Sequence, residues 1–153
     1  MPNRATHQTI AIVTGAVTAF ACAPNRGLSE RLAEAIGGGI GGWTTGMLAD
    51  KLDPPDHPHH RGNGHALVPN AIVAAAYANI VSDWQQALRA QATAYARIAA
   101  QIPPGFEQCW YRILEFLCRA LSGAIVGPLV GHWSHLLLDS QTAYGIPLAY
   151  AGF

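Results

Sequence analysis

The sequence predicts an all-α fold, a compact bundle of about four to five helices in a single domain that covers residues 1–153. Two observations support this prediction. The strict alternation of apolar and polar residues that marks a half-buried strand is absent. Clusters of Pro and Gly divide the chain into four long segments. A chain of 153 residues also has the usual length of one domain and is long enough to bury a core.

The first predicted helix covers about residues 6–22 and ends before the sequence APNRG. The second begins near Ser29, a residue type that caps helix N-termini, with Glu30 in its first turn, and it continues to about residue 50. Five glycines fall within 37–42, and each costs about 1 kcal/mol in an exposed helix. Such a glycine run is expected only where the backbone of another helix packs very close, or where the helix itself is less stable.

The third predicted helix covers about 68–101 and the fourth about 106–140, with a break near Gly127 and Pro128. The first half of the third helix is apolar on nearly all sides, so we expect it to be buried in protein or lipid. The tail, 142–153, is expected to be an extended apolar strap. A polar segment rich in His and Asp connects the second and third helices.

The composition favours contact with a membrane or a large partner. Half of the residues are hydrophobic and only 12% are charged, against about 25% in an ordinary domain, and the mean hydropathy is +0.17. Nine basic residues balance nine acidic ones, so no nucleic-acid partner is expected. Residues 9–23 are too few to span a bilayer, and 113–131 contains Glu115 and Arg119. We therefore expect a peripheral or partly embedded bundle.

The N-terminal segment has the basic start, apolar run and small-residue end of a secretory signal peptide. We expect it to be retained as the first helix, which argues against secretion. The three cysteines, at 22, 109 and 118, have neither the number nor the spacing of a disulfide framework or thiolate zinc site. We expect each to be a small buried apolar residue.

Two groups of polar residues are candidate metal ligands. The segment 50–67 holds four histidines and three aspartates, and it is either a polar surface loop or part of a metal site. His135 and Asp139 are four residues apart, so on a helix they lie on one face and present a nitrogen and an oxygen to a common point. His132 joins the same face. A helix face of satisfied polar groups is the alternative.

Three stretches in order resemble a known family: ATH near the start, GGGIGGWTTGMLADKLDPPDHPHHRGNGHAL in the middle and GHWSHLLLDSQTAYGIPL at the end. They are similar to the bacterial membrane-bound metal-dependent hydrolases, also described as LexA-binding, inner-membrane-associated hydrolases. In this chain Ala49 replaces the family's proline, and Asp53 stands where glutamate is common. The resemblance implies metal ligands at His7, Asp50, Asp53, His60, His65, His135 and Asp139. His57, His59 and His132 fall outside the family pattern.

The resemblance also implies a mechanism, because this family is similar to the zinc phospholipase C and single-strand nuclease superfamily. One or more ions of zinc, or of another divalent metal such as manganese, would activate water for attack on a phosphoester. Arg61 would hold developing negative charge, and Asp50 or Asp53 would act as general base or bridging ligand. The implied substrate is a phospholipid head group, and the implied location is the inner membrane, where we expect the cytoplasmic side.

A second hypothesis belongs to another class. The chain would be a non-catalytic structural or interaction protein, such as a phage assembly subunit or a membrane-associated regulator, that keeps a structural metal. A protein partner or a homo-oligomer is expected in that case. The two hypotheses differ in coordination, because a structural zinc is closed by four protein ligands and a catalytic zinc keeps an open position.

Overall fold

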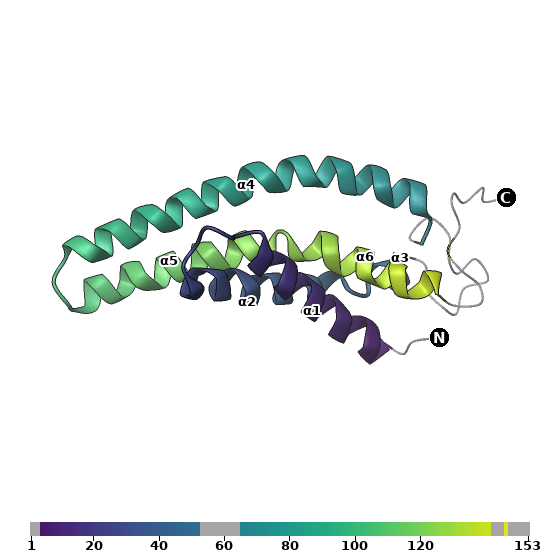
Figure 1. Cartoon of the computed structure of the whole chain (residues 1–153), viewed down its shortest axis with the longest axis horizontal. Helices are drawn as coiled ribbons and strands as arrows, with labels where there is room; N and C mark the ends of the chain where they lie inside the picture. The colour runs from purple at the N-terminus through teal and green to yellow at the C-terminus, as the bar shows by residue number, and fades with distance from the viewer. Residues whose placement is uncertain (1–3, 53–64, 142–145, 147–153) are drawn as a thin grey trace.

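A computed structural model of the chain describes residues 4–52, 65–141 and 146. The predicted all-α bundle is confirmed, since these residues form helices and no strand. The helical segments are α1 (Arg4–Ala21), α2 (Leu28–Thr45), α3 (Leu48–Leu52), α4 (Leu67–Gln101), α5 (Phe106–Ala124) and α6 (Gly127–Ser140). The break expected near Gly127 and Pro128 separates α5 from α6, which follow one another along the long axis (Figure 1).

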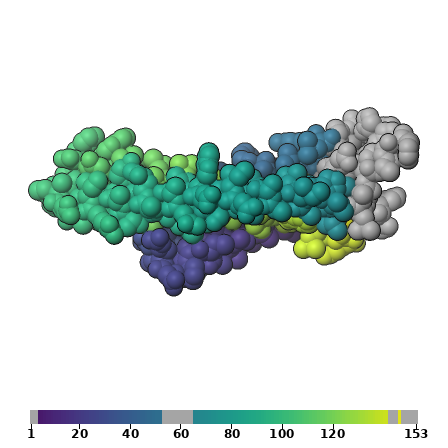
Figure 2. All heavy atoms as spheres, turned by 90° about the horizontal axis from the view of Figure 1, so that it is seen from above, coloured from purple at the N-terminus to yellow at the C-terminus, as the bar shows by residue number. Residues whose placement is uncertain are grey.

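Helix α2 is the centre of the bundle. It packs against α1 on one side and against α5 and α6 on the other, while α4 packs mainly against α5. Figure 1 shows α4 arching over α5 and α6, with α1 and α2 on the opposite side. Figure 2, seen from above, shows α4 along almost the whole length of the molecule.

The glycines of α2 allow its backbone to touch α1. A Cβ atom on Gly38 would overlap with the carbonyl oxygen of Gly15, and one on Gly42 would overlap with that of Ala11. This confirms the first of the two explanations for the glycine-rich stretch, the close approach of another backbone.

The same helix touches α5 with its other side. A Cβ atom on Gly37 would overlap with the carbonyl oxygen of Ala120, and one on Gly41 with that of Ala124. Two neighbouring helices therefore contact the α2 backbone directly, one on each side. Any larger side chain on either face would push the helices apart.

Local boundaries correct two expectations. The N-cap of α2 is Gly27 and not Ser29; the backbone N–H of Gly27 donates to the Glu30 carboxylate, 3.0 Å away. The second predicted helix, expected to continue to about residue 50, ends at Thr45, and Asp50 lies in a separate short helix, α3. The prediction of three buried cysteines is also wrong, because Cys22 and Cys109 are exposed and Cys118 is half-buried.

Large apolar side chains lie mostly outside the bundle and small ones inside. The buried apolar residues of the described segments are Ala11, Ala19, Ala23, Ala33, Ala49, Ala66, Val81, Ala92, Ala99, Val126 and Leu136. Many large apolar residues are exposed, among them Val17 (61%), Ile40 (56%) and Ile72 (66%). By length and hydropathy alone, the stretch Phe106–Ser140 is a candidate membrane span.

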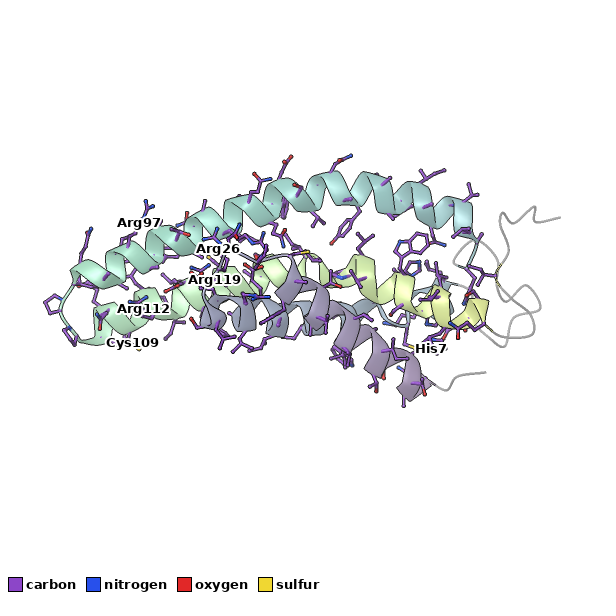
Figure 3. All side chains as sticks on the ribbon, in the orientation of Figure 1. His7, Arg26, Arg97, Cys109, Arg112 and Arg119 are labelled. Atoms are coloured by element: carbon purple, nitrogen blue, oxygen red, sulfur yellow. The ribbon has the colours of Figure 1, made fainter. Side chains whose placement is uncertain are left out.

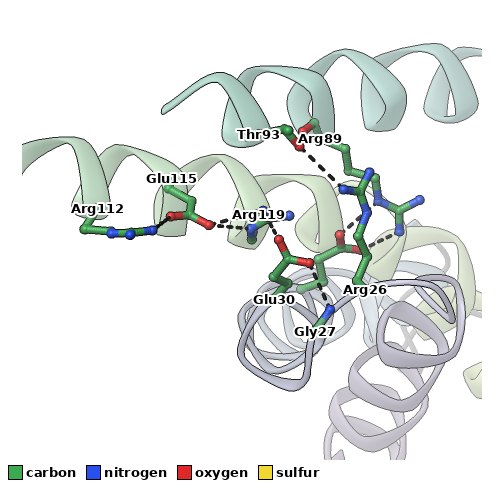
Figure 4. A network of polar contacts seen from close by, with 9 residues as sticks. Arg26, Gly27, Glu30, Arg89, Thr93, Arg112, Glu115 and Arg119 are labelled. Atoms are coloured by element: carbon green, nitrogen blue, oxygen red, sulfur yellow. Dashed lines mark hydrogen bonds and ion pairs between the residues drawn. The ribbon is translucent and has the colours of Figure 1, made fainter. Parts of the chain in front are cut away.

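A network of arginine and glutamate side chains ties α2, α4 and α5 together (Figure 4). The buried carboxylate of Glu34 accepts from Arg89, whose Nε lies 2.9 Å from Oε1. Arg119, also buried, forms ion pairs with Glu30 and Glu115. Removal of one partner would leave a buried charge uncompensated, so these pairs fix which helices meet here.

We predict that Gly37→Ala destabilises the protein by about 1–3 kcal/mol, because the new methyl group has to displace the backbone of α5. The matched control is Gly39→Ala in the same helix, where a Cβ atom would meet Ile12 Cγ2 at an ordinary 3.5 Å. This control is expected to raise stability by about 0.5–1 kcal/mol through helix propensity. Free energies of unfolding measure both effects, and equal values for the two variants would contradict the packing account.

Candidate metal centre

Four polar side chains meet at one end of the bundle. Asp50 comes from α3, His65 from the residues just before α4, and His135 and Asp139 from adjacent turns of α6. One nitrogen or oxygen atom of each residue lies within 4.8 Å of the corresponding atoms of the others. The predicted pairing of His135 with Asp139 on one helix face is confirmed, and the group can hold a metal ion.

The distances between these atoms are nearly equal. Nε2 of His65 lies 3.4 Å from Asp50 Oδ1 and 3.4 Å from Asp139 Oδ2. Nε2 of His135 lies 3.3 Å and 3.4 Å from the same two oxygens. These four separations are longer than the roughly 2.7–2.9 Å of a charge-assisted hydrogen bond.

The four nitrogen–oxygen separations are those expected between neighbouring ligands of one four-coordinate ion. Ligand atoms bonded at about 2.0–2.1 Å to a tetrahedral zinc lie about 3.3–3.4 Å from one another. Two imidazole nitrogens and two carboxylate oxygens are donors that suit zinc and related divalent metals, manganese included. The geometry therefore fits a small divalent cation better than direct hydrogen bonds between the side chains.

A backbone carbonyl orients His135 toward the cluster. Nδ1 of His135 lies 2.8 Å from the carbonyl oxygen of Gly46, which accepts the Nδ1 proton. Nε2 is then the nitrogen left to bind a metal, and it has no hydrogen-bond partner among the described residues although it is buried. A buried imidazole held in this way is the usual arrangement of a metal ligand.

Asp50 is the most accessible member of the cluster. Its side chain is 23% exposed, whereas that of Asp139 is 5% exposed and those of the two histidines are fully buried. Burial alone would raise the pKa of Asp50, but the neighbouring imidazoles of His135 and His65 outweigh it and lower that pKa well below the usual range. Asp50 is therefore an anion at neutral pH, on the side where the cluster opens to solvent.

His7, also a predicted ligand, lies beside the cluster. Its Nε2 is 3.6 Å from Asp139 Oδ1, the carboxylate oxygen that does not face His65 and His135. Its ring packs on that of His135 with centroids 4.1 Å apart. Figure 3 shows His7 at the end of the bundle opposite Arg97 and Arg112. The structure brings His7 to the site but not into the group of four.

The remaining predicted site residues fall outside the described residues. These are Asp53, His60 and Arg61, together with the loop histidines His57 and His59. The proposed roles of Asp53 as ligand or base and of Arg61 as charge stabiliser stay predictions.

Sequence analysis missed two groups that support the site. The Gly46 carbonyl has no signature in the sequence, because any residue offers a carbonyl. Oδ1 of Asn70 accepts a hydrogen bond from Nε2 of His132, 2.7 Å away. An amide in the apolar first half of the third predicted helix was the available signal for Asn70.

An apolar cavity of about 570 Å³ lies between α3, α4 and α6, the helices that carry or adjoin members of the cluster. Its wall includes Leu48 and Leu52 of α3 and His132, one turn from His135 on α6, but none of the four clustered residues. Its other residues are Thr45, Pro69, Asn70, Val73, Ala74, Tyr77, Pro128, Leu129 and Trp133. A mostly apolar lining with a few polar groups is typical of small-molecule sites.

Comparisons with known proteins give no relative. No family model, no curated protein and no solved structure matches the chain. The similarity to metal-dependent hydrolases therefore rests on the three quoted stretches alone.

We predict that the purified protein binds about one equivalent of a divalent metal per chain, and that the double variant His135→Ala, Asp139→Ala loses it. Elemental analysis after dialysis against zinc or manganese measures the content. The matched control is His132→Ala, which removes an imidazole one turn away and is expected to retain the metal. Equal metal in the double variant and the native protein would show that the ion binds elsewhere.

Proposed function

We propose that the chain is a membrane-associated, metal-dependent hydrolase that acts on phosphoesters such as phospholipid head groups. One observation carries the proposal: two histidines and two aspartates form a buried cluster, spaced for a divalent ion, on elements that also line an apolar cavity. The order of the three family-like stretches supports it independently, since they supply all four clustered residues.

The four side chains are suited to phosphoester chemistry. A divalent ion bound by them would polarise a phosphoryl oxygen and lower the pKa of a bound water to about 7. Asp139 and the two histidines are buried and held by their surroundings, so they would keep the ion in place. Asp50 borders the solvent and is the described residue best placed to accept a proton from an attacking water.

The cavity favours a substrate with an apolar part. It extends along α4 from Pro69 to Tyr77, and at the 1.5 Å rise of a helix this is about 12 Å. An amphiphile would place its polar head at the cluster and its chain against Val73 and Ala74. A nucleotide or sugar phosphate has no apolar chain to pack against the cavity residues Val73 and Ala74.

Membrane association is supported by the many exposed large apolar side chains and by a candidate span within Phe106–Ser140. Large exposed apolar patches mark protein or membrane contact sites. The inner membrane, its cytoplasmic side and a homo-oligomeric state stay predictions.

A specific observation favours the structural alternative as well. The cluster offers four protein donors, the number that closes a structural zinc site. Such an ion would join α3, the start of α4 and α6 without any reaction. Under this hypothesis the protein is an assembly subunit or a membrane-associated regulator.

We predict that the metal exchanges a ligand with phosphate, as a hydrolytic site requires. The protein loaded with cobalt(II) is expected to show the intense visible absorption of a tetrahedral ion, and inorganic phosphate is expected to change that spectrum. The Asp50→Asn variant, which keeps shape but weakens the exposed ligand, serves as the comparison. A spectrum that no concentration of phosphate alters would favour the structural alternative.

We predict that Ala74→Trp raises the KM for a short-chain phospholipid severalfold and leaves metal content unchanged, because the indole fills the cavity between α3, α4 and α6. Ile72→Trp is the matched control: it places the same side chain on the same helix at a position that is 66% exposed and does not line the cavity. Phospholipid hydrolysis measured at several chain lengths checks the prediction. Equal KM values for both variants would remove the cavity from substrate binding.

A further inference from the structure

We propose that the bundle crosses a lipid bilayer, with the metal cluster at one interface and the arginine–glutamate network toward the other. This deepens the membrane association in the proposed function by replacing a peripheral location with a transmembrane one. It does not depend on hydrolysis, and the experiment below has no activity readout.

A wide band across the described helices of the bundle contains no charged side chain of Asp, Glu, Lys or Arg. No Asp, Glu, Lys or Arg occurs in four segments, one from each long part of the bundle: 5–25, 35–49, 66–82 and 120–138. Each segment is bounded by charged residues or by the cluster itself.

Contacts between helices place these four segments side by side. In the middle of the band, Gly38 of α2 meets the backbone of Gly15 in α1 and of Gly127 in α6. At the same level the Tyr77 hydroxyl of α4 donates to the carbonyl of Ile125, 2.8 Å away. The charge-free segments are therefore in register, and the band runs through the whole bundle.

Both edges of the band are marked by polar contacts between the same helices. At one edge Arg89 of α4 pairs with Glu34 of α2 and donates to the Cys22 carbonyl at the end of α1. At the other edge His135 of α6 donates to the carbonyl of Gly46, beside Asp139. Ionisable groups that border a bilayer are expected to be paired in this way.

The band is somewhat thinner than a typical bilayer core. At 1.5 Å per residue the segment 120–138 is about 28 Å long, 66–82 about 25 Å and 35–49 about 22 Å. The hydrocarbon core of a bilayer is about 30 Å thick, and a shorter apolar stretch is accommodated by local thinning of the bilayer. Trp84 follows Asp83 at one edge of the band and is 65% exposed, as aromatic residues are at membrane interfaces.

The distribution of side chains within the band is that of helices packed in lipid. Large side chains such as Val17, Ile40 and Ile72 point outward on different helices, while the helix contacts are made by Gly and Ala. In water the large apolar side chains would remain exposed, and their burial would not contribute to the stability of the fold. In lipid the chains outside are as apolar as leucine, so close packing of small residues drives association instead.

Beyond the band, the α4–α5 hairpin carries the charges expected of a segment in water. Figure 3 shows Arg97 and Arg112 on this hairpin, well away from His7. Glu115 and Arg112 form an exposed ion pair, 2.9 Å long, near the same end.

The test uses single-cysteine variants in a background in which the three native cysteines are replaced by alanine. Nitroxide labels are placed in the band at Val17→Cys, Ile40→Cys and Ile72→Cys. The controls Phe106→Cys and Trp110→Cys lie on α5 beyond the band and replace side chains that are 87% and 50% exposed. The full-length protein is reconstituted in phosphatidylcholine vesicles, and collision rates are measured with oxygen, which concentrates in lipid, and with a water-soluble nickel chelate.

The proposal predicts that the three band positions collide more often with oxygen than with the nickel chelate, and that the two controls show the reverse. Val17 and Ile40 lie on the α1–α2 side and Ile72 on α4, so a peripheral bundle would shield one side only. Nickel access at either side of the band would overturn the proposal, as would release of the native protein from vesicles by alkaline carbonate. Metal content, measured on the same samples, keeps failure of the membrane placement distinct from failure of the metal site.

Discussion

The contact between the backbones of α2 and its neighbours sets the geometry of the whole molecule. Where Gly37 meets Ala120 and Gly42 meets Ala11, the helices lie closer than ordinary side chains allow. A one-turn shift or a slight separation of α6 from α2 would move His135 away from the Gly46 carbonyl that orients it. The glycines therefore influence the metal cluster indirectly, because they set how closely and in which register α6 packs along α2.

The bundle separates two kinds of polar contact. At one end, the buried Glu34 and Arg119 each have an ion-pair partner within the protein. At the other end, two aspartates face two imidazoles whose nitrogens lie too far for strong hydrogen bonds and at the right distance for a shared cation. The first arrangement is complete in itself, whereas the second becomes complete when a metal binds. That difference is the physical reason to place function at the end formed by α3 and α6.

Part of this structure was predictable from the sequence. Four-residue spacing on a helix was enough to pair His135 with Asp139, and the glycine run gave a close backbone contact as one of two explanations. Asp50 was placed at the end of the second predicted helix, but the break after Thr45 that puts it on a separate helix was not predicted. The Gly46 carbonyl and the cavity arise only when α3, α4 and α6 meet in three dimensions. The uncharged band was also not predicted. It is formed by four segments that lie in register, and none of them is by itself a clean apolar span.

The central claim is that Asp50, His65, His135 and Asp139 bind one ion together, and X-ray absorption at the zinc edge tests it most directly. The account predicts a first shell of about four nitrogen and oxygen atoms at about 2.0–2.1 Å, with the outer-shell scattering of two imidazole rings. It also predicts no sulfur at about 2.3 Å. A first shell that contains sulfur, or that lacks the scattering of two imidazoles, would contradict the assignment of the cluster as the metal centre.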